Sequence, residues 1–391
     1  MKLKVGVIFG GNSVEHEVSI ISAIQAIDNM DKDKYEIIPI YIAKDMTWYS
    51  GPVLLKIENY KDIDNLLKKC KKVCLCKKKE EFCLIDVDSR IKNIVNKIDI
   101  AFPIVHGKNV EDGSLAGFFE TIGIPYVGSG VIGSAIGQDK VILKHVLLAN
   151  SIPVVDYIWF YDYEYLNNKN EIIKKVKELE YPVIVKPACL GSSVGIKFVR
   201  NEKDICEAIE DAITYDKKIL VEKAVSNLVE VNCSVFGDYQ ECDISVTEQV
   251  KTSNSILTYE DKYIGNGKKC GKVCKGIVNT DRIIPAMLDK DILNNINMLS
   301  KEVFRVLNLS GVCRIDFLID MNNKKVYVNE SNIIPGSLAF YLWESKGIKY
   351  SELLDRMIEL GIKNYKEKLK KINSFESNIL SNYNGANGTK K

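Results

Sequence analysis

The stretch VYVNESNIIPG at residues 326–336, read with VCRIDFLI at residues 312–319, decides what kind of fold this chain has. The upstream run alternates apolar and polar residues, so it predicts a strand with Asp316 on its polar face. The first residues of the later stretch predict the partner strand of a hairpin, which carries Glu330 and Asn332 two residues apart. The hairpin therefore brings two carboxylates and one amide together.

Oxygen ligands of this kind suit Mg²⁺, which proteins usually hold with one or two carboxylates together with the phosphates of a substrate. Nucleotide chemistry is the first hypothesis for this site, with Arg314 on the same strand face as Asp316. The alternative is that acidic residues at the end of a hairpin are simply solvated. The N-E-x-N pattern, followed directly by Pro335 and Gly336, favours the functional interpretation.

Length and composition are those of a globular protein with two or three domains: 391 residues, 46% hydrophobic and 27% charged. A formal net charge of +2 argues against a nucleic-acid-binding surface. The basic run at residues 68–79 is predicted to be a solvated edge strand. No apolar segment approaches the roughly 20 residues of a membrane span, and the N-terminus predicts a strand instead of a signal peptide. We therefore expect a cytoplasmic protein without membrane contact.

The eleven cysteines lack the paired spacing of structural zinc sites, and their odd number favours reduced thiols. Cys270 and Cys274 lie in a polar loop rich in Gly and Lys, where a thiol could be exposed. The sequence assigns them no role.

Strand and helix patterns alternate in the first part of the chain and predict a doubly wound, mostly parallel sheet. The predicted strands there are residues 4–9, 35–42, 98–105 and 123–127, and the predicted helices are residues 14–30 and 140–149. A second unit is predicted from strands at residues 181–187 and 219–222. Longer alternating strands at residues 231–236, 243–250 and 312–319 are more typical of an antiparallel sheet.

Two glycine-rich segments are candidates for phosphate binding. The segment GSGVIG at residues 128–133 matches G-x-G-x-x-G, but only Asp156 is available as the acidic ribose ligand, so a nicotinamide site is rejected. The better cradle is GSSVG at residues 191–195, five residues after Lys186. Small residues let backbone N–H groups approach an anion, and the hydroxyls add donors. The alternative is an ordinary surface turn of Gly and Ser.

Eight separate motifs, in order along the chain, resemble those of the D-alanine–D-alanine ligases of the ATP-grasp superfamily. They are GGNSVEHEVS (10–19), HGKNVEDGSLAGFFETIGIPYVGSG (106–130), QDK (138–140), VIVKPACLGSSVG (183–195), VEK (221–223), YEDKY (259–263), RIDF (314–317) and NESNIIPG (329–336). The resemblance runs from residue 5 to about residue 360. It implies an N-terminal α/β substrate-binding domain (1–133), two α+β ATP-grasp subdomains that clamp ATP (134–226, and 227–372 with the metal site) and a flexible tail (373–391).

The resemblance also implies a reaction. ATP phosphorylates the carboxylate of one D-alanine, and the amine of a second D-alanine attacks the acyl phosphate, which gives D-alanyl-D-alanine for peptidoglycan. Such chemistry needs positioning and charge stabilisation and no covalent enzyme intermediate. The metal ligands by resemblance are Asp316, Glu330 and Asn332, which would hold two Mg²⁺ ions, replaceable by Mn²⁺.

The remaining site residues are assigned by resemblance as well. Arg314 would stabilise the developing oxyanion. The residues that would bind the nucleotide are Lys140, Lys186, Lys262, Ser193, Glu222, Lys223, Val225 and Glu230. Of these, Lys140, Lys186 and Lys262 would neutralise phosphate charge. Glu222 and Val225 would face the adenine, and Glu230 would face the ribose. Residues 251–280 combine Lys, Gly, Asn and Ser with few apolar anchors. Their composition predicts a mobile lid that closes over ATP and places Lys262 and Tyr263.

Glu15, Ser192 and Tyr263 correspond to a linked triad in which Glu15 anchors the ammonium of the first substrate. A local role on its helix is the alternative for Glu15. His106 would lie near the same substrate, and a structural hydrogen-bonding role is the alternative for it. Gly336 would contact substrate.

The acceptor site departs from the family pattern. Leu338 stands at the usual Thr position, and Tyr341 stands where a Ser normally helps to bind the acceptor carboxylate. A phenol can also donate one hydrogen bond, so D-alanine in both sites is expected. The alternatives are another acceptor (D-serine or D-lactate), a dipeptide ligase of small-molecule biosynthesis, or a catalytically silent nucleotide-binding relative. The oligomeric state is not given by the sequence, and a homodimer stays open.

Overall fold

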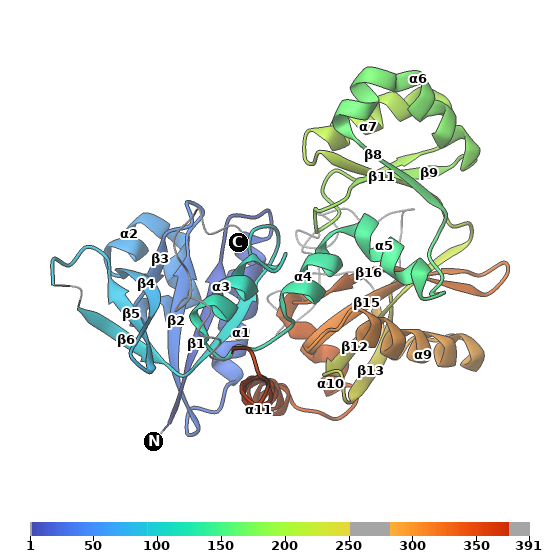
Figure 1. Ribbon diagram of the computed structural model, residues 1–391. Coiled ribbons are helices and arrows are strands. Elements are labelled where there is room, and N and C mark those ends of the chain that lie inside the picture. The colour runs from blue at the N-terminus through green and yellow to red at the C-terminus, as the bar shows by residue number, and fades with distance from the viewer. Residues whose placement is uncertain (1, 92, 251–281, 375–391) are drawn as a thin grey trace, which may run out of the picture.

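The computed structural model describes residues 2–91, 93–250 and 282–374, which form three sheets with helices packed on them (Figure 1). Lys262, Tyr263, Cys270 and Cys274 lie outside the described residues, as do the whole segment expected to close over ATP (251–280) and most of the predicted tail. Within the described part, no helix has both the length and the apolar character needed to cross a membrane.

The N-terminal sheet has seven strands in the order β6-β5-β4-β3-β2-β1-β7. Its strands are β1 (Leu3–Gly10), β2 (Tyr35–Ile42), β3 (Trp48–Ser50), β4 (Lys71–Lys78), β5 (Glu81–Asp86), β6 (Ile94–Ile98) and β7 (Ile100–Val105). β2, β1 and β7 pair in parallel, as a βαβ start predicts. Alternate residues of β1 pack against α1 (His16–Asn29) on one face and towards α3 (Ser114–Ile122) on the other.

The sheet is less parallel than the sequence predicted, because β3 to β6 extend it in antiparallel fashion. β4 is therefore not an edge strand: it lies between β3 and β5, and the edge is β6. Its four lysines are nevertheless exposed, because they stand at the two ends of the strand, while Val73 and Leu75 in its middle face the core. The strand predicted at residues 123–127 is also wrong. Only Tyr126 makes a parallel bridge there, to Ala101.

Several short helices connect these elements. They are η1 (Pro52–Leu55), η2 (Ile57–Lys61) and α2 (Ile63–Lys68) after β3, and α4 (Val131–Gln138) and α5 (Lys140–Ala149) after α3. Asp139 caps α5, since its side chain accepts hydrogen bonds from the N–H groups of Val141 and Ile142.

The central sheet has four antiparallel strands in the order β10-β9-β11-β8. Its elements are β8 (Tyr157–Tyr161), α6 (Asp162–Glu178), β9 (Val183–Pro187), β10 (Lys197–Val199), η3 (Glu202–Asp204), α7 (Ile205–Ile213) and β11 (Lys218–Lys223). Figure 1 shows α6 and α7 on the outer face of this sheet, and the two helices share one apolar core with the sheet.

The C-terminal sheet is antiparallel, as the sequence predicted, with the order β14-β13-β12-β15-β16. Its strands are β12 (Leu228–Gly237), β13 (Cys242–Val250), β14 (Arg282–Ile283), β15 (Gly311–Asp320) and β16 (Lys325–Asn332), and the helix α9 (Lys290–Val306) packs on one face. After β16 come η4 (Gly336–Ala339), α10 (Phe340–Glu344) and α11 (Tyr350–Leu369).

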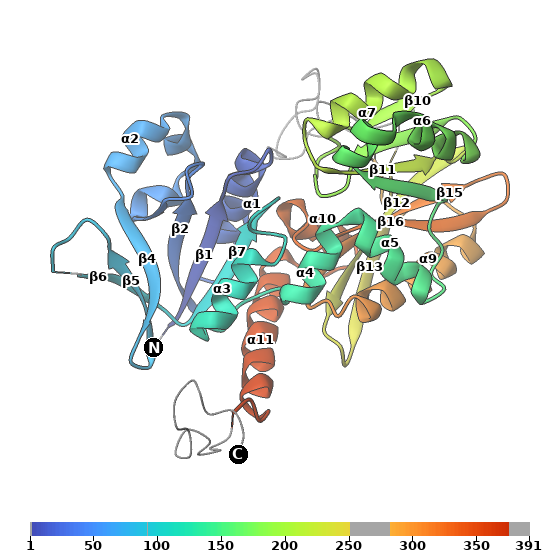
Figure 2. The same cartoon turned by 45° about the horizontal axis from the view of Figure 1, so that its top comes forward.

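The last helix returns to the start of the chain. Leu353, Leu354 and Met357 of α11 belong to the same apolar core as Val5 and Val7 of β1. In Figure 2, α11 extends along the junction between the N-terminal and C-terminal sheets. The N-terminal sheet therefore depends on a helix that comes more than 300 residues later for part of its core.

Candidate active site

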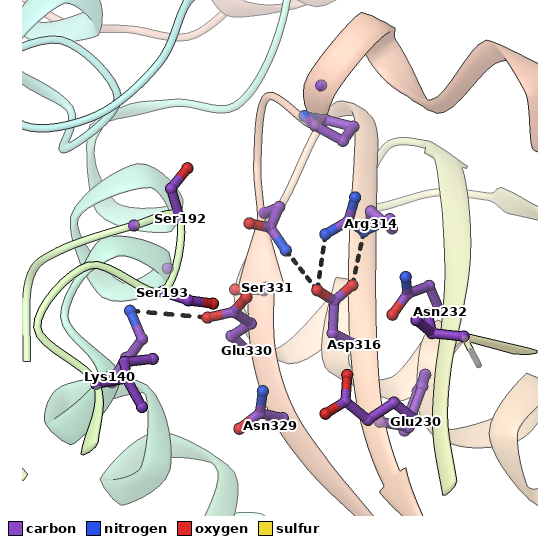
Figure 3. Close-up of a pocket in the computed structure, with 18 of the residues that line it drawn as sticks. Lys140, Ser192, Ser193, Glu230, Asn232, Arg314, Asp316, Asn329, Glu330 and Ser331 are labelled. Atoms are coloured by element: carbon purple, nitrogen blue, oxygen red, sulfur yellow. Dashed lines mark hydrogen bonds and ion pairs between the residues drawn. The ribbon is translucent and has the colours of Figure 1, made fainter. Parts of the chain in front are cut away.

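A row of polar residues crosses four strands of the C-terminal sheet at one level. Glu248 of β13 pairs with Asn232 of β12, Asn232 with Asp316 of β15, and Asp316 with Glu330 of β16. Directly opposite residues of paired strands place their side chains on the same face. All four line one cavity, and Figure 3 shows three of them together.

The predicted hairpin is confirmed, and its register places Asp316 opposite Glu330 and Arg314 opposite Asn332. The Arg314 guanidinium donates two hydrogen bonds of 2.7 Å to the Asp316 carboxylate, and the amide of Asn332 donates one of 3.1 Å (Figure 3). A β-bulge follows directly at Asp316 and Phe317, as is common beside functional sites.

This donor set fits a divalent cation. Like charges directly opposite each other in a sheet repel, and Asp316 and Glu330 are such a pair. Asn332 uses its amide N–H toward Asp316, so its amide oxygen can serve as a ligand. Two carboxylates and one amide oxygen are the kind of incomplete oxygen set with which proteins hold Mg²⁺ against substrate phosphates.

The predicted phosphate cradle lies across the cavity from this hairpin. Ser192 and Ser193 both have left-handed backbones, with φ angles of 55° and 59°, a conformation that non-glycine residues adopt at some cost in energy. Lys140 reaches the same place from α5: its ammonium donates to the carbonyl of Leu190 at 2.8 Å and lies 3.7 Å from the Glu330 carboxylate (Figure 3). The cradle and the metal candidates thus face one another.

Lys186 ends the buried strand β9 beside this cradle and is almost wholly covered. Its ammonium pairs with Glu222 and lies 3.4 Å from the side-chain oxygen of Asn329. Lys186 therefore lines the cavity, and its positive charge is partly balanced by Glu222, which does not line the cavity.

Glu222 is placed differently from the adenine-facing role that the sequence suggested. Its side chain is 1% exposed and lies between Lys186 and Lys144, whose ammonium is 2.6 Å away. Burial alone would raise its pKa, but the two ammonium groups outweigh that effect and lower the pKa to about 2. Among the described residues that line the cavity, Glu222 is absent, and so is Lys223, whose side chain pairs with Glu180 at the surface.

The structure does bring the other described candidates together. The cavity is lined by Glu15, His106, Lys140, Lys186, Ser192, Ser193, Val225, Glu230, Arg314, Asp316, Glu330, Asn332, Gly336 and Tyr341. They come from all three sheets and the loops between them, so the cavity exists only in the assembled chain.

Glu15 precedes α1 and points at the cradle, where the hydroxyl of Ser192 donates to its carboxylate. His106, at the end of β7, is buried. Its ring nitrogen lies 3.4 Å from the hydroxyl of Ser22, and burial lowers its pKa. Both groups line the cavity on the side of the N-terminal sheet.

Gly191 allows this close approach of the cradle to Glu15. A Cβ atom at residue 191 would lie 2.8 Å from a carboxylate oxygen of Glu15. The resemblance implies that Glu15 anchors the ammonium of the first substrate. On that assignment, Gly191→Ala should displace the Glu15 carboxylate and raise the KM of this substrate on the order of tenfold. Steady-state kinetics measures this.

The matched control is Gly117→Ala on α3. The nearest atom to a Cβ there is 3.9 Å away, so that variant should have wild-type kinetics. Equal KM values for wild type and Gly191→Ala would show that Glu15 does not anchor the substrate.

The turn after the hairpin is strained. Ser337, Leu338 and Ala339 have consecutive φ angles of 51°, 54° and 50°. The N–H of Ser337 donates to the hydroxyl of Ser22 at 2.9 Å, and its own hydroxyl donates to Gln25 at 2.6 Å. These contacts with α1 hold the turn that precedes Tyr341.

The polar cavity residues that the sequence analysis missed include Asn232, Glu248 and Glu111. Asn232 follows Glu230 by two residues, so strand alternation placed it on the same face and could have identified it. Glu111 accepts hydrogen bonds from the N–H groups of Gly107 and Ile334. Burial, together with the charge of Glu15, raises its pKa to about 8.

Comparison with known proteins gives a consistent result. The family model described as D-ala D-ala ligase N-terminus matches residues 4–129, and the one described as D-ala D-ala ligase C-terminus matches residues 146–359. A D-alanine--D-alanine ligase of Thermosipho melanesiensis is 41% identical over 380 residues, which is 97% of this chain and 98% of that protein.

Solved structures agree with the sequence matches. The D-alanine-D-alanine ligase from Coxiella burnetii has a TM-score of 0.79 at 28% identity and covers 94% of this chain and 96% of its own. The VanG D-Ala:D-Ser ligase from Enterococcus faecalis has a TM-score of 0.77 at 29% identity, with coverage of 92% and 100%.

Proposed function

The chain belongs to the D-alanine–D-alanine ligase family, and from that premise we propose how its residues join two D-alanines at the expense of ATP. The activity itself, ATP-dependent ligation in the ATP-grasp fold, follows from the family. The use of ATP supports a cytoplasmic location for the reaction, with the dipeptide serving peptidoglycan synthesis.

For the first D-alanine, Glu15 binds the ammonium, and His106 lies beside it at the end of β7. Ser192 holds Glu15 in place by its hydrogen bond, so substrate and phosphate cradle are fixed relative to one another. A first D-alanine oriented in this way presents its carboxylate to the γ-phosphate of ATP. Such orientation supplies a large part of the rate enhancement in phosphoryl transfer.

For ATP, the N–H groups of the Ser192–Ser193 turn and the hydroxyl of Ser193 bind phosphate oxygens, while Lys140 and Lys186 neutralise their charge. Val225 and Glu230, which also line the cavity, contact the base and the ribose. Glu222 serves this site indirectly, because it fixes Lys186 through a buried ion pair.

Asp316, Glu330 and Asn332 would hold Mg²⁺, for which their oxygens fit. When bound, the metal supplies charge neutralisation and orientation of the ATP phosphates. Arg314 is fixed by its paired hydrogen bonds to Asp316 and offers its remaining N–H groups to the oxyanion that forms when the acceptor amine attacks the acyl phosphate.

The observation that carries this proposal is that the Asp316–Glu330 pair, Arg314 and the Ser192–Ser193 cradle line one cavity. The test is phosphate release from ATP across a panel of D- and L-amino acids, with product masses. D-alanine alone should release phosphate and yield D-alanyl-D-alanine.

Chelation by EDTA should abolish that activity, and Mg²⁺ or Mn²⁺ should restore it. Phosphate release only with a second, different amine would identify another acceptor. Release that is indifferent to every amino acid would overturn the proposal.

A further inference from the structure

The acceptor side of the cavity contains a buried carboxylate that the mechanism above does not use. Glu248 is 1% exposed and lies at the end of the polar row on β13. Three groups converge on it: the Tyr341 hydroxyl at 2.9 Å, the Asn232 amide at 3.2 Å and the Arg282 guanidinium at 2.8 Å.

These contacts fix the direction of the hydrogen bond from Tyr341. A carboxylate paired with a guanidinium is ionised and only accepts hydrogen bonds, so the phenol must be the donor. Because a phenol has one hydrogen, Tyr341 has none left for a ligand in the cavity. The Arg282 guanidinium also lies over the Tyr341 ring, 5.3 Å from its centre, and this cation–π contact helps to hold the ring in place.

The sequence-level expectation that Tyr341 donates to the acceptor carboxylate is therefore not compatible with this arrangement. The phenol oxygen can still accept a hydrogen bond from the cavity. D-alanine has one group that donates, its amine, while its carboxylate only accepts and its methyl does neither.

We propose that Tyr341 orients the nucleophilic amine of the acceptor by accepting a hydrogen bond from it. Glu248 is the positioning residue, because it takes up the only hydrogen that the Tyr341 hydroxyl can donate. The proposal rests on the assignment of this cavity as the ligase site. It leaves the acceptor carboxylate to other groups of the cavity. It also gives the Tyr at this position a different task from that of a carboxylate-binding Ser.

The first test separates amine from carboxylate recognition. D-alaninamide keeps the amine of D-alanine and lacks its carboxylate, so it is compared with D-alanine as an acceptor-site ligand in wild type and in Tyr341→Phe. The variant should weaken both ligands by the same factor, about fivefold, for one hydrogen bond. A loss confined to D-alanine would show that Tyr341 contacts the carboxylate and would overturn the proposal.

The second test is a double-mutant cycle between Tyr341→Phe and Glu248→Gln. The carboxamide can donate to the phenol oxygen, which reverses the direction of this hydrogen bond and leaves the phenol hydrogen free to point into the cavity. Each variant should raise the KM of the acceptor about fivefold, and the double variant should raise it no further, with the KM values for ATP and donor unchanged. Additive effects, or equal effects on all substrates, would contradict the positioning role.

The matched control is Asp243→Asn on the same strand. Asp243 pairs with Lys346 and lies outside the cavity, so its loss should leave acceptor KM unaltered. If Glu248→Gln does not fold, the comparison of D-alanine with D-alaninamide in Tyr341→Phe decides alone. If the wild-type enzyme yields the mass of D-alanyl-D-alanine, the ligase assignment holds and a failed test concerns Tyr341 alone. If it does not, the ligase assignment itself is wrong.

Discussion

Glu330→Gln should lower the turnover of the ligase by roughly 100-fold or more while leaving the fold intact. The carboxamide keeps the size of the side chain but removes one of the two negative charges that face each other across β15 and β16. The hairpin would then hold Mg²⁺ more weakly, and less positive charge would be available to neutralise the ATP phosphates. Phosphate release at saturating ATP and Mg²⁺ measures the effect, and thermal unfolding checks the fold.

A control exists on the same hairpin. Asp320 lies at the other end of β15, opposite Lys325 and away from the cavity, so Asp320→Asn should retain wild-type turnover. If Glu330→Gln turned over at the wild-type rate in saturating Mg²⁺, the metal assignment would be wrong.

Glu222→Gln should lower the free energy of unfolding by about 3–5 kcal/mol, the usual cost of breaking a buried ion pair from one side. The variant leaves the ammonium groups of Lys144 and Lys186 buried without their shared counter-charge. Chemical denaturation near neutral pH measures the difference. Glu180→Gln, which breaks the exposed pair with Lys223 nearby, should leave the unfolding midpoint unchanged.

The difference in the free energy of unfolding between wild type and Glu222→Gln should become smaller in acid. The pKa of Glu222 is lowered from the ordinary 4.5 to about 2, so the folded state holds this proton more weakly than the unfolded state. Its stabilising contribution is complete above about pH 4.5 and is lost as the pH falls toward 2. The gap between wild type and Glu222→Gln should shrink over that range, and a gap that widened in acid would contradict the ion-pair explanation.

The hairpin and the cradle could be predicted from the sequence because local patterns determine them. Strand alternation fixes which residues share a face, and a short hairpin fixes the register that sets Asp316 opposite Glu330. The Gly-Ser turn after Lys186 likewise announces a place where backbone N–H groups can approach an anion.

Other features depend on long-range packing and leave no local signal. Whether Glu222 faces ATP or two lysines is decided by α5, which brings Lys144 from 78 residues away. The contacts of Glu248 with Arg282 and Tyr341 form only in the folded chain, so the sequence around Glu248 does not reveal them. The left-handed turn at Ser337 and Leu338 consists of residues with no preference for that conformation, so tertiary contacts with α1 must impose it.

The return of α11 to the N-terminal sheet has a consequence for biosynthesis. On the ribosome, β1 and α1 emerge first, yet the apolar surface that α11 covers stays open until almost the whole chain has been made. The nascent N-terminal sheet should therefore be a client for chaperones that shield apolar surface until α11 packs on it. The N-terminal sheet would then mature only after α11 has been synthesised and has packed against it, however early its own strands are made.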